Sequence, residues 1–157
     1  MGFFMPDLDE ADRRLLHLLQ RDSTLSTQAL AEQAGLSTSP AWRRVKRLID
    51  EGYIARQVAI VPPVMAGMHA MAYVQVSLLD HREDSLAAFD RFVQTEDQII
   101  ECATITGTSD FLLKIVAPDP EGLEHFIMRR LLALGIIRGS VTNFVLRQTK
   151  YTTAMPV

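Results

Sequence analysis

The sequence has a single cysteine and no long apolar run, and both scarcities limit the class of protein. With Cys102 alone, the 157-residue chain cannot form an internal disulfide, which suits a reducing compartment. Residues 1–6 contain no basic region and no extended apolar stretch, so they do not resemble a signal peptide. No segment approaches the roughly 20 apolar residues that a membrane-spanning helix needs. We therefore expect a soluble, cytoplasmic protein without a membrane partner.

Motifs for catalysis and metal binding are also missing. The four histidines are dispersed, and neither an H-x-x-x-H nor a C-x-x-C pair occurs. The chain contains no G-x-S-x-G nucleophile motif and no glycine-rich phosphate loop. Cys102 falls within a predicted strand, where a buried and unreactive side chain is the ordinary case. We expect no enzymatic activity, no metal site and no cofactor.

An excess of basic charge is lacking as well, because the net charge is −3. The charge is nevertheless unevenly placed. Residues 41–56 carry five basic and two acidic side chains, a local charge of +3 on an otherwise acidic chain. A small basic element of this kind can contact the phosphates of DNA, although charge alone is equally consistent with a solvated helix face.

Helical periodicity runs through the first part of the chain. Recurring leucines predict an amphipathic helix over residues 7–20, with acidic residues in its first turn, where the helix dipole favours them. Ser26 is a suitable N-cap for a second helix over residues 27–34. Gly35 then supplies the sharp stop that ends this helix.

A third helix follows after a short turn. Ser37 caps it, and Pro40 falls in its first turn, where a missing N–H group costs little. The helix is expected to run to Glu51. The second and third helices, separated by the turn Ala34–Ser37, have the spacing of a helix-turn-helix. Residues 53–60 alternate weakly in polarity and predict one extended strand or the arm of a hairpin.

Runs rich in β-forming residues alternate with helices after Pro62 and Pro63, a pair that predicts a stiff linker. The expected order is strand 69–79, a helix marked by Leu86, Phe89 and Val93, strand 99–106, turn 107–110, strand 111–117, a helix over 123–134 and a last strand within 136–150. This βαββαβ order is that of ferredoxin-like folds, so the predicted fold class is α+β.

The predicted organisation has two domains. A helix-turn-helix domain covers residues 1–61, a linker covers 62–68, and a ferredoxin-like domain covers 69–157. Several strands of the second domain are partly apolar on both faces, whereas its two helices can cover only one face of a sheet. The uncovered face needs a partner, so we expect a homodimer in which two sheets face each other.

The third helix carries the candidate DNA-reading residues. With Val45 taken as the centre of the buried side, the predicted core stripe consists of Ala41, Trp42, Leu48 and Ile49. Arg43 and Arg47 lie on the opposite face and are the candidates for bidentate contacts with guanine. Their neighbours are expected to hold phosphates. The predicted DNA-binding residues are Ser37, Thr38, Ser39, Pro40, Arg43, Arg44, Lys46 and Arg47.

Gly107, Thr108, Ser109 and Asp110 form the turn between the two central predicted strands. Glycine permits a tight turn, and the hydroxyls, free amides and carboxylate could together read the ammonium and carboxylate groups of an amino acid. An ordinary hairpin turn with an Asx-type cap would contain the same residues. Spacing alone favours this second interpretation.

A series of short stretches occurs in a familiar order along residues 7–156. They are Leu8-Asp9, Ala29-Leu30-Ala31, Leu36-Ser37, Trp42-Arg43-Arg44-Val45-Lys46-Arg47-Leu48, Gly52-Tyr53-Ile54, Glu101-Cys102, Thr106-Gly107-Thr108-Ser109-Asp110-Phe111-Leu112-Leu113-Lys114, Val145-Leu146 and Lys150. This series resembles the Lrp/AsnC family, the feast/famine transcriptional regulators.

The resemblance implies a winged-helix-type domain that binds double-stranded DNA, followed by a ferredoxin-like domain for effector binding and assembly. It also implies dimers that build octamers or comparable assemblies, with amino acids bound between dimers. Residues Gly107–Asp110 occupy the effector-loop position, which reverses the preference for an ordinary turn. Thr142, in the last strand, aligns with a hydroxyl position near the same pocket. Thr108 and Ser109 stand where many members have an acidic and an aromatic residue.

Two functions are consistent with these features. The leading hypothesis is a sequence-specific transcriptional regulator whose assembly and DNA affinity respond to a small effector, an amino acid by resemblance. In that case effector binding favours one assembly or one placement of the DNA-binding heads and so shifts DNA affinity. The alternative is an architectural protein that compacts DNA with the same domains and without a ligand.

Overall fold

The computed structural model describes residues 8–157, and the chain divides into two compact units. The first unit contains the residues up to Ala59 together with 150–157, and the second contains 60–149. The domain limits expected from the sequence instead assign the last eight residues to the second domain. The expectation for residues 1–6 and the predicted helix start at Asp7 lie outside the described residues.

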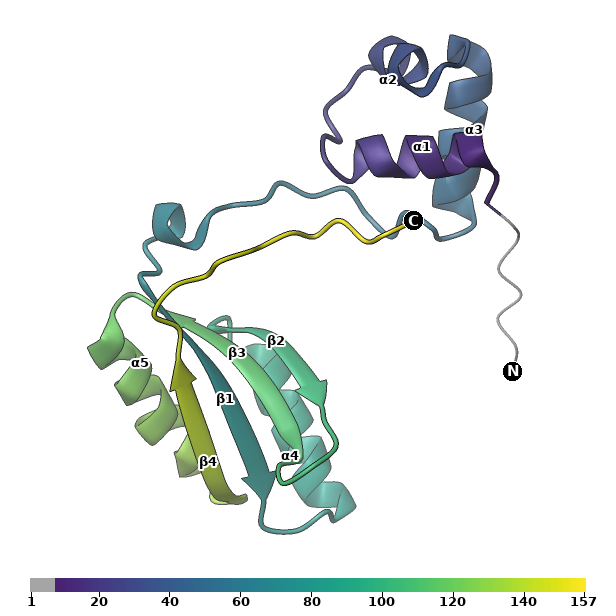
Figure 1. Ribbon diagram of the computed structural model, residues 1–157. Coiled ribbons are helices and arrows are strands. Elements are labelled where there is room, and N and C mark those ends of the chain that lie inside the picture. Colours follow the sequence, from purple (N-terminus) through teal and green to yellow (C-terminus); the bar gives the residue numbers. More distant parts are fainter. Residues whose placement is uncertain (1–7) are drawn as a thin grey trace. The chain divides into compact units, whose positions relative to one another are not determined.

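The described part of the first unit contains three helices (Figure 1): α1 (Glu10–Leu19), α2 (Thr27–Ala34) and α3 (Thr38–Asp50). A reciprocal capping box begins α1, in which the side chains of Asp9 and Asp12 each accept a hydrogen bond from the other's backbone N–H. Ser26 caps α2, and Gly35 ends it with φ at 68°, a conformation that favours glycine. These features confirm the predicted helix-turn-helix.

The core of the first unit is small and rich in leucine. Its buried residues are Leu15, Leu16, Leu30, Ala31, Ala34, Ala41 and Leu48. On α3 the buried side is centred on Ala41 and Leu48 rather than on Val45, which is half-buried. The predicted burial of Trp42 and Ile49 is therefore wrong, because their side chains are 54% and 46% exposed.

The strand predicted over residues 53–60 is not present in the structure. Tyr53 and Ile54 pack against the core of the first unit, and the Ile54 amide donates to the carbonyl of Leu48 at 3.1 Å. A strand needs a neighbouring strand to pair with. The backbone of residues 55–61 makes no hydrogen bond to any residue that the structure describes. The helical turn η1 (Pro63–Ala66) follows within the expected linker.

The C-terminal residues are fastened to α1. The side-chain amide of Gln20, the C-cap of α1, donates to the carbonyl of Met155 at 3.1 Å and accepts from the Met155 N–H at 2.6 Å. Val157 lines an open surface pocket of about 330 Å³ together with side chains of α1 and α2. The first unit is thus assembled from two segments that are far apart in the sequence.

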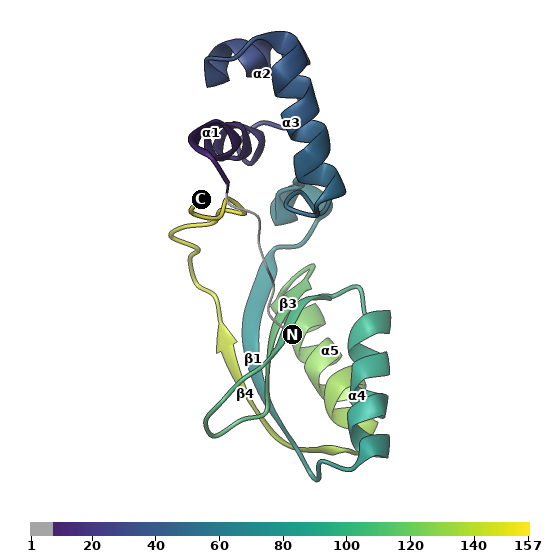
Figure 2. The ribbon, with the colours of Figure 1, turned by 90° about the vertical axis from the view of Figure 1, so that its right-hand side faces the viewer.

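The second unit is a sheet with helices on one face (Figures 1 and 2). Its elements are β1 (Ala70–Leu78), α4 (Glu83–Thr95), β2 (Ile99–Thr104), β3 (Phe111–Ala117), α5 (Pro120–Phe126), the turns η2 (Ile127–Leu131) and η3 (Leu132–Leu134) that extend α5, and β4 (Ile137–Phe144). The described strands pair antiparallel in the order β2-β3-β1-β4. This topology confirms the predicted ferredoxin-like α+β fold.

The two faces of the sheet differ in their environment. The side chains of β1 that point toward α4 and α5, such as Val74 and Val76, are fully buried, and Phe89 of α4 packs against Phe111 with ring centroids 4.4 Å apart. The alternate residues of β1, such as Tyr73 and Gln75, lie on the face that has no helix and are only half-buried. Figure 2 shows both helices on the same side of the sheet. One sheet face is therefore left without a helical cover.

Cys102 is exposed on the edge strand β2, so the prediction that it is buried is wrong. Although the side chain reaches the surface, neighbouring protein atoms partly desolvate its sulfur, and this desolvation together with the charge of Asp90 raises the pKa of the thiol and favours the weakly nucleophilic protonated form. Within residues 8–157, no group of three or more histidine, cysteine or acidic side chains is placed to hold a metal ion. Over the same residues, no helix has the length and apolarity to cross a membrane.

Candidate DNA interface and effector loop

A buried carboxylate on α1 holds two arginines of α3. Asp12 is 1% exposed, and its two oxygens accept from Arg44 at 2.8 Å and from Arg47 at 2.5 Å. Arg44 also donates to Asp9 at 2.7 Å. Because Asp9 and Asp12 also cap the start of α1, one cluster fixes both the beginning of α1 and the rotation of α3.

The carboxylates and guanidinium groups of this cluster stabilise one another. The backbone N–H of Asp12 and the guanidinium of Arg44 hold the pKa of the Asp9 carboxyl below its ordinary value of 3.8. Hydrogen bonds to Asp12 in turn raise the pKa values of Arg44 and Arg47. Asp9, Arg44 and Arg47 therefore stay ionised at neutral pH. The two arginines are engaged within the protein before any DNA is present.

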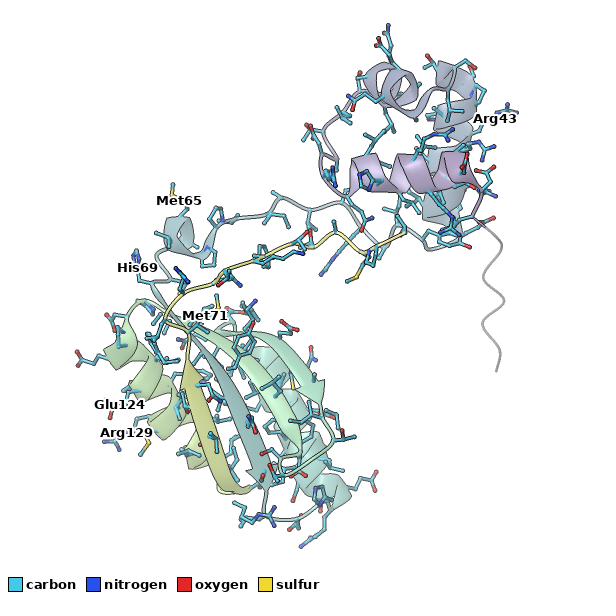
Figure 3. The ribbon with its side chains drawn as sticks, viewed as in Figure 1. Arg43, Met65, His69, Met71, Glu124 and Arg129 are labelled. Atoms are coloured by element: carbon cyan, nitrogen blue, oxygen red, sulfur yellow. The ribbon has the colours of Figure 1, made fainter. Side chains whose placement is uncertain are left out.

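A different stripe of α3 faces the solvent. Ser39, Trp42, Arg43 and Lys46 follow one another at helical spacing, and all four are exposed. The Lys46 ammonium lies over the Trp42 ring, 5.6 Å from its centroid. Arg43 projects from α3 into solvent (Figure 3) and makes no hydrogen bond or ion pair with any residue between Leu8 and Val157. We call these four residues the exposed stripe.

The remaining predicted DNA-binding residues lie at the start of α3. Ser37 is its N-cap but makes no side-chain capping hydrogen bond, so its hydroxyl is available to another acceptor or donor. Thr38 is exposed and Pro40 is half-buried in the first turn. An open surface pocket of about 480 Å³ is lined by Thr27, Thr38, Ser39, Trp42 and Arg43. The structure thus brings the beginnings of α2 and α3 together beside the exposed stripe.

Sequence reasoning placed Arg47 with Arg43 and missed Asp12. The structure separates the two arginines: Arg43 points to solvent, whereas Arg47 bonds to α1. A signal for the second partner exists in the sequence, because Asp9 and Asp12 have the spacing of a capping box at the start of a predicted helix. The charges of that box were available to pair with basic residues on a neighbouring helix.

The turn between β2 and β3 is built around Asp110 and Gly107. Gly107 has φ at 123°, a region that L-residues rarely adopt. The carboxylate of Asp110 accepts from the Leu78 N–H at 2.8 Å and contacts His81 Nε2 at 3.0 Å. These contacts, the amide first, lower the pKa of Asp110. Asp110 therefore ties the turn to the end of β1 as a charged group.

The rest of the turn keeps free polar groups. Ser77 donates to the carbonyl of Thr108 at 3.4 Å. The amides of residues 106–109 and the hydroxyls of Thr108 and Ser109 donate no hydrogen bond to any residue that the structure describes. Thr142 lies on β4 opposite Val74, whereas the turn contacts Ser77 and Leu78 farther along β1. No hydrogen bond among residues 8–157 joins Thr142 to the turn.

The matches to known families cover both units. Residues 8–55 match the family described as winged helix-turn-helix DNA-binding, and residues 71–155 match the Lrp/AsnC ligand binding domain. The chain belongs to the Lrp/AsnC family. This member is 33% identical over 150 residues to the DNA-binding transcriptional activator DecR of Escherichia coli, a match that covers 96% of this chain and 99% of DecR. It is thus a DNA-binding transcriptional regulator with a ligand-binding domain.

Solved structures of the family agree with the fold. A transcriptional regulator of Neisseria meningitidis, NMB0573, in complex with L-methionine, superposes with a TM-score of 0.92 at 30% identity and covers 96% of this chain and 97% of its own. An AsnC family regulator of Agrobacterium tumefaciens gives a TM-score of 0.90 at 35% identity, with 95% and 97% covered. The shared architecture agrees with the α+β fold of this Lrp/AsnC family member.

Proposed function

We propose that this protein regulates transcription by binding a specific DNA sequence through α3 and an amino acid through the turn Gly107–Asp110. The observation that carries the proposal is the exposed stripe. It presents an unpaired arginine, a lysine and an indole on the solvent side of the second helix of a helix-turn-helix. In this motif, that helix enters the major groove and its side chains meet base edges.

Roles within the DNA interface follow from the contacts that each side chain already makes. Arg43 has no partner among the described residues and is the candidate for bidentate pairing with guanine. Lys46 and the hydroxyls of Ser37, Thr38 and Ser39 are suited to phosphates, which fix the register on the duplex. Arg44 and Arg47 are bonded to Asp12, but their side chains are 32% and 40% exposed, so their remaining N–H groups can still reach a phosphate.

The effector proposal rests on the free polar groups of the turn and on one relative. Unpaired amides and two hydroxyls form a donor set for a carboxylate, while Asp110 holds the turn in shape. NMB0573 was solved with L-methionine. We infer an amino-acid effector for this protein, with its carboxylate read by the amides and hydroxyls of residues 107–109. Thr142 contributes from β4 if an assembly brings a second chain's turn close to it.

Assembly and location form part of the same proposal. The sheet face without helices is suited to pairing with the same face of a second copy, and dimers then build a larger assembly, an octamer in the form expected from the sequence. We infer a cytoplasmic protein without enzymatic activity, in agreement with relatives that are named as transcriptional regulators.

The test uses the full-length protein and DNA from upstream of its own gene. DNA affinity and the mass of the protein are measured while each of the common amino acids is added. The double variant Thr108→Ala/Ser109→Ala should weaken the active amino acid by about tenfold, because two hydrogen bonds are lost. Thr106→Ala removes an exposed hydroxyl just before the turn and serves as the matched control. A protein that binds DNA but responds to none of the amino acids fits the architectural function instead.

A further inference from the structure

Trp42 is a large apolar side chain in an unusual place. Trp42 is 54% exposed on the solvent side of α3, whereas the buried hydrophobic cluster of the same unit consists of leucines and alanines. The indole N–H has no acceptor among the described residues, and the Lys46 ammonium lies over the ring. An exposed aromatic ring with a cation beside it is typical of a binding surface rather than of a folding core.

The neighbours of Trp42 indicate what covers it. Arg43 and Lys46 flank it with positive charge, and the pocket beside it is rimmed by the hydroxyl residues Thr27, Thr38 and Ser39. This combination of cations and hydroxyls around an apolar centre complements a polyanion more closely than an apolar protein surface. The distribution of charge on α3 supports the same partner. Arg44 and Arg47, on the other flank, are already bonded to Asp12, so the positive charge open to a polyanion lies beside Trp42.

Duplex DNA offers one apolar group to such a side chain. Bases within a duplex remain stacked, so an indole cannot stack on them, and the floor of the major groove presents donors, acceptors and the 5-methyl group of thymine. Trp42 lies in the first half of α3, beside Arg43, where a recognition helix approaches base edges. With Arg43 paired to a guanine, the indole of Trp42 lies over the adjacent base pair, where the only apolar group is a thymine 5-methyl.

We propose that Trp42 is a specificity-determining residue that reads a thymine 5-methyl group next to the base pair contacted by Arg43. The inference rests on the proposed DNA-binding role of α3. It adds a preference for thymine over cytosine or uracil at one position of each half-site, a discrimination that hydrogen bonding by Arg43 alone does not supply.

The experiment removes the methyl group without altering base pairing. The full-length protein selects its tightest duplex from a random library, and that duplex is resynthesised with each thymidine replaced singly by deoxyuridine. The wild-type protein should lose about fourfold in affinity for each contacted methyl, the value for burying one such group. Trp42→Ala should bind the thymidine and deoxyuridine duplexes equally. Ile49→Ala, the matched control, removes a side chain that is 46% exposed on the same helix and should keep the wild-type penalty.

Each other outcome overturns the inference. A wild-type protein that is indifferent to every deoxyuridine, or a Trp42→Ala variant that keeps the penalty, shows that the indole does not read a methyl group. If Trp42→Ala changes the mass of the assembly but still loses affinity for the deoxyuridine duplexes, Trp42 forms a contact between copies of the protein instead. If the library yields no preferred duplex, the proposed function itself fails, which is distinct from a duplex that is bound without methyl dependence. Thermal unfolding of each variant verifies that the first unit is folded.

Discussion

Replacing Asp12 with asparagine should destabilise the first unit more than the loss of one surface charge would. The side chain is 1% exposed, and each of its oxygens accepts from a different arginine of α3. Asparagine keeps one acceptor oxygen but presents an NH₂ group to the other guanidinium, so two donors would face each other. The substitution also weakens the capping box at the start of α1, where Asp12 accepts from the Asp9 N–H.

The magnitude follows from the exposure of the partners. Breaking a buried ion pair costs about 3–5 kcal/mol when the remaining charge stays buried. Here the side chains of Arg44 and Arg47 are 32% and 40% exposed and can regain water, so we expect about 2–3 kcal/mol. For a unit of this size, such a loss lowers the unfolding midpoint by about 10–20 °C.

The assay follows the first unit separately from the second. Trp42 is the only tryptophan in the chain and lies on α3, so its fluorescence reports the unfolding of this unit. Glu10→Gln is the control, because it removes an ion pair with Arg14 in which both side chains are well exposed, and should cost less than about 1 kcal/mol. If Asp12→Asn lowers the midpoint no further than Glu10→Gln does, the cluster does not hold α3 against α1 and the reasoning is refuted.

Three further predictions concern single side chains. Because the Leu78 amide and His81 lower the pKa of Asp110, this carboxylate stabilises the second unit above its ordinary pKa of 3.8, and the contribution disappears as the pH falls through the lowered value. Asp110→Asn should abolish that part of the acid dependence of the second unit's unfolding; an unchanged acid limb would contradict the assignment. Arg43→Ala should relax discrimination at one base pair by about 1–3 kcal/mol. Lys46→Ala should instead weaken all duplexes alike and reduce the salt slope by about one, and a reversed pattern would exchange the two roles.

Local rules predicted the helices of the first unit well. Ser26 and Gly35 each act on a turn within a few residues, through a cap and a left-handed conformation respectively, so the sequence alone contains their signal. The ferredoxin-like order of the second unit was predictable for the same reason. Its strands and helices differ in period and are separated by turn residues.

The rotation of α3 could not be predicted from its own periodicity. Hydrophobic spacing places Val45 at the centre of the buried side, but the partner that decides the rotation is Asp12, more than thirty residues earlier in the chain. Arg44 and Arg47 donate to Asp12 and therefore face α1, which places Trp42 on the solvent side of α3. The same limit applies to Asp110, whose partners on and after β1 are about thirty residues away.

Edge positions account for the other errors. Cys102 has the neighbours of a buried strand residue, yet β2 is at the edge of the sheet, where the second neighbour is missing. Residues 53–60 have a suitable composition for a strand but no strand beside them in the described structure. Whether a strand forms, or is buried, depends on what lies next to it, and a single sequence does not contain that information.

The bond between Gln20 and Met155 has a consequence for biosynthesis. During synthesis α1, α2 and α3 emerge from the ribosome first, and residues 150–157 emerge only after the whole sheet domain has been made. The DNA-binding unit is therefore begun first and completed last, with the effector domain folding in the interval as an insertion between its two parts. A nascent chain cannot acquire its finished DNA-binding unit before the domain that senses the effector has been synthesised.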